Sequence, residues 1–427
     1  MPSGAPAPTH VSAETNTRPG NNSLGEKVEY DPFSPAMAED PYPTYGWLRD
    51  NVPVYHNAER GFYALTRYQD VLAAFLDAET FLTSHGTTLE GLEDGFDTLL
   101  TTDPPEHDWN RKILTRRFSA IRIQELEPRI REVTTMLLDD ARDAGRIDLV
   151  AGFSARLPMV ITAEILGLPV DQRDLVRDLC GRLMERDIAD TPGVLPASAA
   201  KAAAELAQIL LALIAERRGR PTDDLVSLLI HTPVVAGDGT EYYLDDHQLL
   251  GRVAELTVAG YETVMKLVSS GAVRLAEAPA ARAELARDPS LIPNAVEEML
   301  RMDPPAQYTG RWTSRDIEIH GTVIPADHRV LLLIAAACRD ERTYSHPECL
   351  DIRRDVGRQL GFGYGIHLCL GAALARLEAR VAFEELLSRH PTYQVDYDGI
   401  VRTYSSNQRG LKHLPLNLNP SVSSAVQ

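Results

Sequence analysis

The feature that most constrains the fold is one apolar stripe in the second half of the chain. Between residues 247 and 278, apolar and small side chains recur at intervals of three and four, which is typical of one face of a helix. They are Leu249, Val253, Leu256, Gly260, Val264 and Leu267. Such a helix would end before Pro279 and, at about 1.5 Å per residue, would be roughly 45 Å long. A helix of that length crosses a whole domain, so we expect it to be the central element.

Helical patterns also dominate the rest of the chain, and strand patterns are few. Shorter helices are predicted at residues 68–78, 106–118, 122–144, 156–167, 198–218, 291–302 and 370–389. Strands are predicted at residues 61–66, 317–324 and 330–334. We find no repeat and no linker that would divide the chain. We therefore expect one mainly α domain with a minor β portion at residues 28–418, between a disordered leader at 1–27 and a flexible tail at 419–427.

Charge and cysteine content exclude several classes of protein. The 427 residues include 43 Lys and Arg against 61 Asp and Glu, and the resulting net charge of −18 disfavours nucleic-acid binding. The four cysteines form no CxxC pair, which argues against a disulfide framework or an ordinary zinc site. Residues 1–27 lack the pattern of a secretory signal, and no uninterrupted apolar stretch is long enough for a membrane anchor. These features predict a cytoplasmic protein.

A glycine-dense segment before Cys369 carries the strongest chemical signal. Glycines stand at positions 361, 363 and 365, and an apolar helical stripe follows, so Cys369 would lie at or just before a helix N-terminus. Free N–H groups and the helix dipole favour a thiolate there, which suits a metal-binding sulfur. A buried structural cysteine is the ordinary alternative, but it does not need glycines that let the backbone approach a flat ligand. A nucleotide loop is rejected because Ile366 stands where GxGxxG needs its last glycine, and the CxxCH signature of covalently attached haem is absent.

This segment matches the pattern FGxGxHxCxG at every fixed position and resembles the cytochrome P-450 family, the haem-thiolate monooxygenases. The resemblance implies the single-domain cytochrome P-450 fold and haem b, iron protoporphyrin IX, as the cofactor. It also implies that Cys369 is the iron ligand, that His367 hydrogen-bonds a haem propionate and that Phe362 packs near the sulfur. Gly363 and Gly371 belong to the same cofactor-binding loop. Thiolate ligation of haem iron favours cleavage of the O–O bond.

A charge pair upstream of the cysteine loop looks like the ExxR motif of the same family. Glu298 and Arg301 are three residues apart, so they share one face of a predicted helix. On their own they would be taken for an exposed ion pair worth about 0.5 kcal/mol or less. By the resemblance, Arg354 completes a buried structural network with them.

The long predicted helix contains a segment similar to the family's AGxxT oxygen-activation motif. Ala259 and Gly260 would lie against the cofactor, and Glu262 and Thr263 would relay protons to the oxygen that is being reduced. The alternative is an ordinary helix glycine followed by a threonine whose hydroxyl bonds back to a carbonyl. Glu262 and Thr263 are the catalytic residues that the resemblance implies.

Basic residues elsewhere are candidates for holding the haem propionates. His107 and Arg111 are four residues apart in a predicted helix and match the family's HxxxR pattern, and Arg311 matches a further propionate arginine. The alternative is a solvated basic helix face. Ten basic residues in the segments around these motifs predict a basic patch for an acidic electron donor: Arg111, Lys112, Arg116, Arg117, Arg122, Arg353, Arg354, Arg358, Arg376 and Arg380. We expect a ferredoxin, with its reductase as a separate protein.

The substrate pocket is assigned by family position. Its walls are expected from residues 82–100, 180–198 and 405–407 and from a set of single positions. That set is Glu255, Val258, Ala259, Ala306, Gln307, Tyr308 and Ser406. Glu255 could bind a basic or hydroxyl group, although a solvated or arginine-paired glutamate is the commoner case.

The resemblance implies a monooxygenase that uses dioxygen to hydroxylate or epoxidise a hydrophobic small molecule, as a tailoring step on a secondary metabolite. Two alternatives remain. One is an enzyme of the same fold that catalyses oxidative coupling or a peroxide-driven oxidation. The other is a non-catalytic haem sensor, which would need the cysteine loop but no acid and alcohol opposite the iron.

Overall fold

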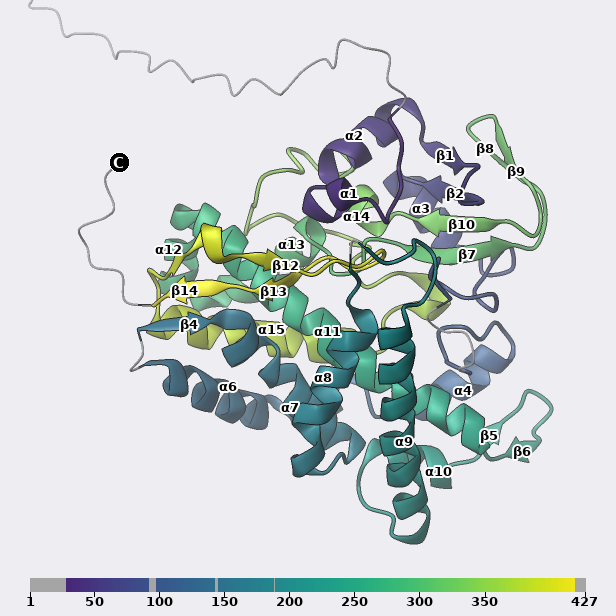
Figure 1. Ribbon diagram of the computed structural model, residues 1–427, viewed down its shortest axis with the longest axis horizontal. Helices are drawn as coiled ribbons and strands as arrows, with labels where there is room; N and C mark the ends of the chain where they lie inside the picture. The colour runs from purple at the N-terminus through teal and green to yellow at the C-terminus, as the bar shows by residue number, and fades with distance from the viewer. Residues whose placement is uncertain (1–27, 92–96, 143–144, 188, 419–427) are drawn as a thin grey trace, which may run out of the picture.

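The computed structural model describes residues 28–91, 97–142, 145–187 and 189–418 (Figure 1). The predicted leader at 1–27 and tail at 419–427 lie outside the described residues. Helices make up most of the chain, as the sequence predicts, and one larger sheet lies beside them (Figure 1). The first helices are α1 (Pro35–Glu39), α2 (Tyr42–Asn51), α3 (Tyr68–Leu76), α4 (Glu106–Thr115), α5 (Ala120–Gln124), α6 (Glu127–Arg142), α7 (Arg156–Leu166) and α8 (Arg173–Met184). They are followed by α9 (Ala197–Gly219), α10 (Leu225–His231), α11 (Asp246–Glu277), α12 (Pro279–Arg287), α13 (Ile292–Met302), α14 (Ile334–Ala337) and α15 (Ala372–Arg389).

The larger sheet has the strand order β1-β2-β10-β7-β3. Its strands are β1 (Val54–Asn57), β2 (Phe62–Leu65), β10 (Arg329–Leu332), β7 (Thr309–Thr313) and β3 (Phe81–Leu82). Strands β2 and β10 pair in parallel, and the other pairs are antiparallel. Both faces of the sheet are buried, because alternate residues of β2 enter different apolar clusters: Tyr63 and Leu65 pack with α3, and Phe62 and Ala64 pack with the N-terminal segment.

Four smaller sheets complete the fold in the described part of the chain. One joins β11 (Gln394–Val395), β14 (Pro415–Asn417) and β4 (Arg146–Asp148). The others pair β5 (Val234–Val235) with β6 (Glu241–Tyr242), β8 (Ile317–Ile319) with β9 (Thr322–Ile324), and β12 (Val401–Arg402) with β13 (Leu411–His413). The prediction of one strand at 317–324 is therefore wrong, because His320 and Gly321 have positive φ and turn the chain into a hairpin. The helix predicted at 122–144 is likewise divided into α5 and α6.

Helix α11 is the central element, as its apolar stripe predicts. It begins with a capping box, in which the Asp245 carboxylate accepts from the Gln248 N–H at 2.8 Å and the Gln248 side chain accepts from the Asp245 N–H at 3.2 Å. It ends at Glu277, before Pro279 begins α12. Helices α7, α8, α9, α13 and α15 all pack against it. Helix α11 thereby connects the main apolar core to the cavity described below.

Helix α9 is long and apolar enough to cross a membrane by length and composition alone, with a mean hydropathy of 1.5 over its most apolar window. It is the one such helix in the described part of the chain. Charged residues such as Lys201 and Glu205 interrupt it. It packs on α8, α10 and α11, and buries a stripe that includes Leu206, Leu210 and Leu213. These are the contacts of a helix that belongs to a folded domain.

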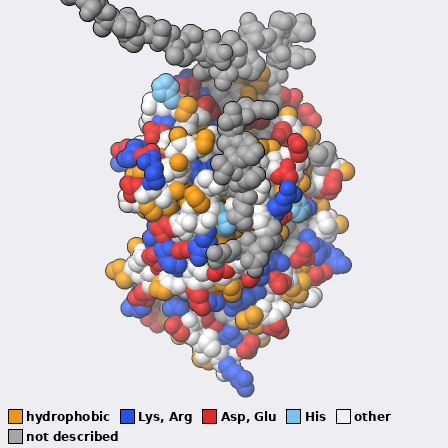
Figure 2. Space-filling model, turned by 90° about the vertical axis from the view of Figure 1, so that its left-hand side faces the viewer, with side chains coloured by type: hydrophobic (Ala, Val, Ile, Leu, Met, Phe, Trp, Pro, Cys, Tyr) orange, Lys and Arg blue, Asp and Glu red, His pale blue; other side chains and the backbone are white. Residues whose placement is uncertain are grey.

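Acidic and basic side chains are interspersed on the face that carries α6 and α12 in Figure 1 (Figure 2). Between α6 and α15, Arg131 lies 2.6 Å from both Glu384 and Glu385, and Arg380 lies 2.5 Å from Glu127. Partly exposed ion pairs of this type contribute little to stability. The net charge of −18 is thus not gathered on this face.

Candidate active site

Two glycines shape the chain before Cys369. Gly363 and Gly365 have φ values of +67° and +72°, which residues with a side chain rarely adopt. A Cβ at Gly365 would lie 2.3 Å from the Phe75 carbonyl oxygen, so only glycine lets the loop pack this closely on α3. The Cys369 N–H donates to the Phe362 carbonyl oxygen at 2.9 Å, and α15 begins three residues later. Cys369 therefore lies just before a helix N-terminus, as predicted.

The Cys369 side chain faces a large internal cavity. The cavity has a volume of about 360 Å³ and is lined mostly by apolar side chains of α4, α7, α11 and α15 and of the loop before α15. Protein surrounds the thiol, and its accessible surface lies in the cavity rather than on the outside. Burial raises the pKa of the Cys369 thiol, and the Gly371 N–H and the Arg111 guanidinium oppose that shift. A metal ion reached from the cavity would complete the stabilisation of a thiolate.

One end of the cavity gathers four basic side chains. The rings of His107 and His367 lie with their centroids 4.3 Å apart, and Arg111, Arg311 and His367 line the cavity. Burial lowers the pKa of Arg311 to about 10, and burial together with the Arg311 charge lowers the pKa of His367 to about 3. Within the described residues, neither guanidinium forms an ion pair and the buried His107 Nε2 has no hydrogen-bond partner. A ligand with anionic groups at this end would satisfy these donors.

Comparisons with known proteins identify the family. A family model described as Cytochrome P450 matches residues 195–398. The vitamin D(3) 25-hydroxylase of Pseudonocardia autotrophica is 35% identical over 402 residues, which cover 92% of this chain and 97% of that protein. The chain belongs to the cytochrome P-450 family. The cytochrome P-450 monooxygenase PikC of Streptomyces venezuelae is 34% identical over 411 residues, covering 94% of this chain and 96% of PikC.

Solved structures agree with this P-450 fold. A mutant of EryK in complex with erythromycin B matches with a TM-score of 0.82 and 34% identity, over 91% of this chain and 99% of that one. The complex of Bacillus megaterium CYP109E1 with testosterone matches with a TM-score of 0.81 and 28% identity, over 89% of this chain and 98% of that one. The chain is therefore a P-450 monooxygenase, an oxidoreductase whose family uses a haem-thiolate cofactor.

The residues around the cavity fit haem. Cys369 would hold the iron from one side, and the unpaired Arg111 and Arg311 would bind the two propionates. The unpartnered His107 Nε2 and the ring of His367, beside it, are suited to hydrogen-bond the same carboxylates. Bound there, haem supplies the activation of dioxygen, which a thiolate ligand promotes.

The three residues of the predicted structural network contact one another and are buried. The Arg301 guanidinium donates to both oxygens of Glu298, at 2.6 and 2.9 Å, and Arg354 donates to one of them at 3.0 Å. Neither Glu298 nor Arg301 has any exposed surface. Arg301 also donates to the carbonyl oxygens of Cys338 and Pro347, both at 2.9 Å. The network therefore connects α13 to the segment that leads into the cysteine loop.

The predicted pair of acid and alcohol on α11 is divided by the structure. Thr263 lines the cavity, and its hydroxyl donates to the Ala259 carbonyl oxygen at 3.0 Å. Glu262 does not line the cavity; it is 2% exposed and forms an ion pair with Lys266 one turn later. Successive residues of a helix point about 100° apart, so neighbours on α11 face different surroundings. The structure therefore places Thr263 at the cavity and Glu262 beside it on the helix but outside the cavity wall.

The substrate walls are partly as predicted. Four of the predicted single positions line the cavity: Glu255, Ala259, Ala306 and Tyr308. The cavity is also lined by Thr87, Leu99 and Leu100 from the predicted 82–100 wall, by Asn407 from the 405–407 segment and by Gly260. No described residue of 180–198 does so. The sequence did not lead us to expect Thr162, Ile165 and Leu166 of α7 in the cavity wall. Glu378 of α15 was also missed as a wall residue, although it lies four residues after Leu374 and therefore on the same helix face.

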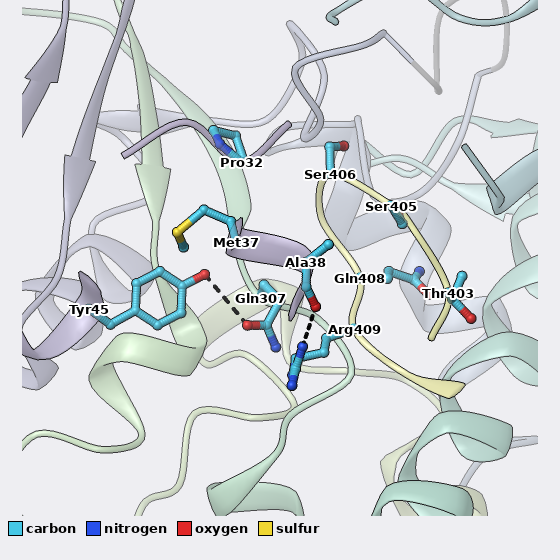
Figure 3. A pocket seen from close by; sticks show the side chains of 10 residues that line it. All are labelled: Pro32, Met37, Ala38, Tyr45, Gln307, Thr403, Ser405, Ser406, Gln408 and Arg409. Carbon is cyan, nitrogen blue, oxygen red and sulfur yellow. Dashed lines mark hydrogen bonds between the residues drawn. The ribbon is translucent and has the colours of Figure 1, made fainter. Parts of the chain in front are cut away.

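Gln307, Ser406 and Val258 are not part of the cavity wall, contrary to prediction. Gln307 and Ser406 line a separate cavity of about 20 Å³ near the N-terminal segment, which has room for about one water molecule (Figure 3). Gln307 accepts from the Tyr45 hydroxyl at 3.5 Å and donates to the Pro304 carbonyl oxygen at 2.8 Å. Val258 packs against the main apolar core. Contacts made by the N-terminal segment decide the placement of Gln307 and Ser406, and local sequence does not report them.

Glu255 binds protein backbone. Its carboxylate accepts from the Leu99 N–H at 2.7 Å and from the Leu100 N–H at 3.1 Å, while burial raises its pKa to about 7. One turn earlier, Arg252 donates to the Asp97 carbonyl oxygen at 2.6 Å and to its carboxylate at 2.9 Å. Helix α11 thus holds the 97–102 segment, which forms part of the cavity wall and leads to the helix that carries His107.

We expect Gly251→Ala to loosen this segment, because a Cβ at Gly251 would lie 2.1 Å from the Asp97 carbonyl oxygen. The displacement should weaken binding of the bulky azole 4-phenylimidazole about tenfold, whereas binding of imidazole should change less. Both affinities are measured from the shift that the azole causes in the haem spectrum. The matched control is Gly181→Ala in α8, where nothing lies within 4 Å of the new Cβ. Equal losses for the two azoles would contradict a role of the segment in shaping the cavity.

Most of the predicted basic patch is neutralised. Arg117, Arg122, Arg353, Arg354, Arg376 and Arg380 form ion pairs with Asp or Glu. Arg111 faces the cavity. Of the ten residues, Lys112, Arg116 and Arg358 remain exposed without an ion pair to a described acid. The patch is therefore smaller than the sequence suggests.

Proposed function

We propose that this P-450 monooxygenase hydroxylates or epoxidises a hydrophobic small molecule of steroid or macrolide size, as a tailoring step on a secondary metabolite. The observation that carries the proposal is the large, mostly apolar cavity in which Cys369 and Thr263 both lie. A cavity of this kind favours a ligand bound mainly by apolar burial, with few polar groups to orient it. The relatives support the same size class, since EryK is found with erythromycin B and CYP109E1 with testosterone.

A ligand screen tests this proposal. Steroids, macrolides and fatty acids would be added to the purified holoenzyme, and displacement of iron-bound water would be followed in the haem spectrum. Binders would then be incubated with NADPH and a surrogate ferredoxin and reductase, and products with one added oxygen atom would be sought by mass spectrometry. If steroids and macrolides leave the spectrum unchanged while fatty acids shift it, the proposed substrate class is wrong.

We propose that Cys369 holds the iron, that His107, Arg111, Arg311 and His367 hold the propionates, and that Thr263 assists proton delivery. The expected result for Thr263→Ala is a several-fold larger share of NADPH electrons ending as hydrogen peroxide, because a hydroxyl that can hold a proton in the cavity is lost. Peroxide and product are measured per NADPH consumed. Thr263→Ser, which keeps the hydroxyl, is the control, and an unchanged product yield in Thr263→Ala would contradict the role.

We propose a ferredoxin as electron donor and a cytoplasmic location. The exposed Lys112, Arg116 and Arg358 support a small basic contact, whose attraction for an acidic partner would fall as salt is added. Because most neighbouring arginines are paired, we expect a modest salt dependence of the reduction rate.

A further inference from the structure

A small polar network that the site described above does not use holds the start of the cysteine loop. Glu297 on α13 accepts from the Gln359 side-chain nitrogen at 2.8 Å. Its two oxygens also accept from the Arg376 guanidinium of α15, at 2.5 and 3.1 Å. The next residue, Glu298, belongs to the buried structural network instead. Consecutive acids of α13 therefore hold different parts of the chain.

Gln359 fixes the backbone of the loop. The residue is 8% exposed, and its side-chain oxygen accepts from the Gly361 N–H at 2.9 Å. A Cβ at Gly361 would lie 2.7 Å from both that oxygen and the Cγ of Leu300, so the chain passes between the two without spare room. Gly361 and Leu300 both line the cavity. The position of the cavity wall here therefore depends on Gln359, which Glu297 holds in place.

Arg376 holds the aromatic ring of the same loop. Its guanidinium carbon lies 4.5 Å from the centroid of the Phe362 ring, and its two contacts with Glu297 fix the plane of the group. Phe362 lines the cavity that Cys369 faces, and its carbonyl oxygen accepts from the Cys369 N–H at 2.9 Å. Both the ring and the backbone beside the cysteine are thus tied to Glu297.

We propose that Glu297, Gln359 and Arg376 are positioning residues for the iron ligand. This proximal clamp holds Phe362 and the loop backbone beside Cys369, and it thereby sets the reduction potential of the haem iron. Burial and hydrogen bonding around an iron ligand are two of the means by which a protein tunes that potential. The inference rests on the proposed role of Cys369 as the iron ligand.

The direction of the effect follows from charge. Reduction of the iron by one electron adds a negative charge to the site, and apolar surroundings that exclude water disfavour that charge. Loosening the proximal clamp admits water to the sulfur, where it donates hydrogen bonds and withdraws electron density from the iron. Both changes favour the reduced state, so a loosened clamp raises the reduction potential.

Potentiometric titration of the purified holoenzyme tests the proposal with two variants that keep the net charge. Gln359→Met keeps the length of the side chain without its hydrogen bonds. Arg376→Lys keeps the charge but loses the planar group that lies on Phe362 and binds Glu297 through two nitrogens. We expect each variant to raise the equilibrium constant for one-electron reduction at least threefold, which is about 28 mV at 59 mV per factor of ten.

The matched control is Arg380→Lys. Arg380 lies one turn further along α15 and forms ion pairs with Glu127 and Glu384, outside the proximal clamp. This variant should leave the potential unchanged. Equal shifts in Arg376→Lys and Arg380→Lys, or a wild-type potential in Gln359→Met and Arg376→Lys, would overturn the proposal.

The double variant tests whether the three residues act as a unit. Its shift in potential should be smaller than the sum of the two single shifts, because either change already releases the loop. Additive shifts would mean independent effects and would contradict a single clamp. The reduced carbon monoxide complex of the wild type separates this inference from the proposed function. Without a thiolate-type spectrum the assignment of Cys369 fails, whereas a thiolate-type spectrum with unshifted potentials in the variants contradicts only the clamp.

Discussion

Replacing Cys369 by serine is expected to abolish the thiolate-type spectrum of the reduced carbon monoxide complex and to lower turnover by at least about two orders of magnitude. A serine hydroxyl has a far higher pKa than a thiol and is a poor ligand for haem iron. The effect should be specific, because the loop around position 369 is held by the positive φ values of Gly363 and Gly365 rather than by the sulfur. Spectra of purified, haem-reconstituted protein measure it.

Cys349→Ser is the matched control, because Cys349 is a free, exposed cysteine outside the cavity. We expect it to keep the wild-type spectrum and turnover. A Cys369→Ser protein that retained the thiolate-type spectrum would contradict the assignment of the iron ligand.

The second large effect is expected at the buried network around Glu298. Replacement of Glu298 by glutamine leaves the Arg301 and Arg354 guanidinium groups without a negative partner in the protein interior. Arg301 has no exposed surface, and breaking such a buried pair costs about 3–5 kcal/mol. We therefore expect a fall of that size in the free energy of unfolding, measured by urea titration, together with weaker retention of haem, since the network supports the segment that leads to Cys369.

Glu284→Gln is the control for that experiment. Glu284 pairs with Arg353 at 2.6 Å, but 61% of the Arg353 side chain is exposed, so solvent screens the pair. This variant should unfold at nearly the same urea concentration as the wild type. If Glu298→Gln and Glu284→Gln were equally stable, the buried network would not support the fold.

Local patterns predicted much of the fold and the cofactor site. Helix α11 was predictable because its apolar stripe, the Asp245 cap and Pro279 are all local signals. The cysteine loop was predictable because its glycines meet a backbone requirement that no other residue meets well. The hairpin of β8 and β9 was missed because its turn is only two residues long, between short strands of the same β-type pattern.

The walls of the cavity were harder to predict, because their residues come from segments far apart in the chain. Gln307 was expected at the substrate, but the N-terminal segment, through Tyr45, draws it into a separate small cavity. Glu255 could be placed on the correct face of α11, yet its partners, the N–H groups of Leu99 and Leu100, lie more than 150 residues away in sequence. Periodicity assigns a side chain to a helix face but does not say what covers that face.

By itself, the sequence determined the helix-dominated fold and the position of Cys369 before a helix. These properties follow from backbone requirements and short-range periodicity, which act within a few residues. The basic residues for an anionic cofactor were indicated by the resemblance to the cytochrome P-450 family. Only the tertiary structure decided which acids the cavity contains. Glu262 pairs with Lys266 one turn along the same helix and does not line the cavity, whereas Glu255 lines it and accepts from the N–H groups of Leu99 and Leu100. The physical reason is that which face of a helix borders a cavity depends on how the other segments pack around it, and that arrangement is a property of the packed core.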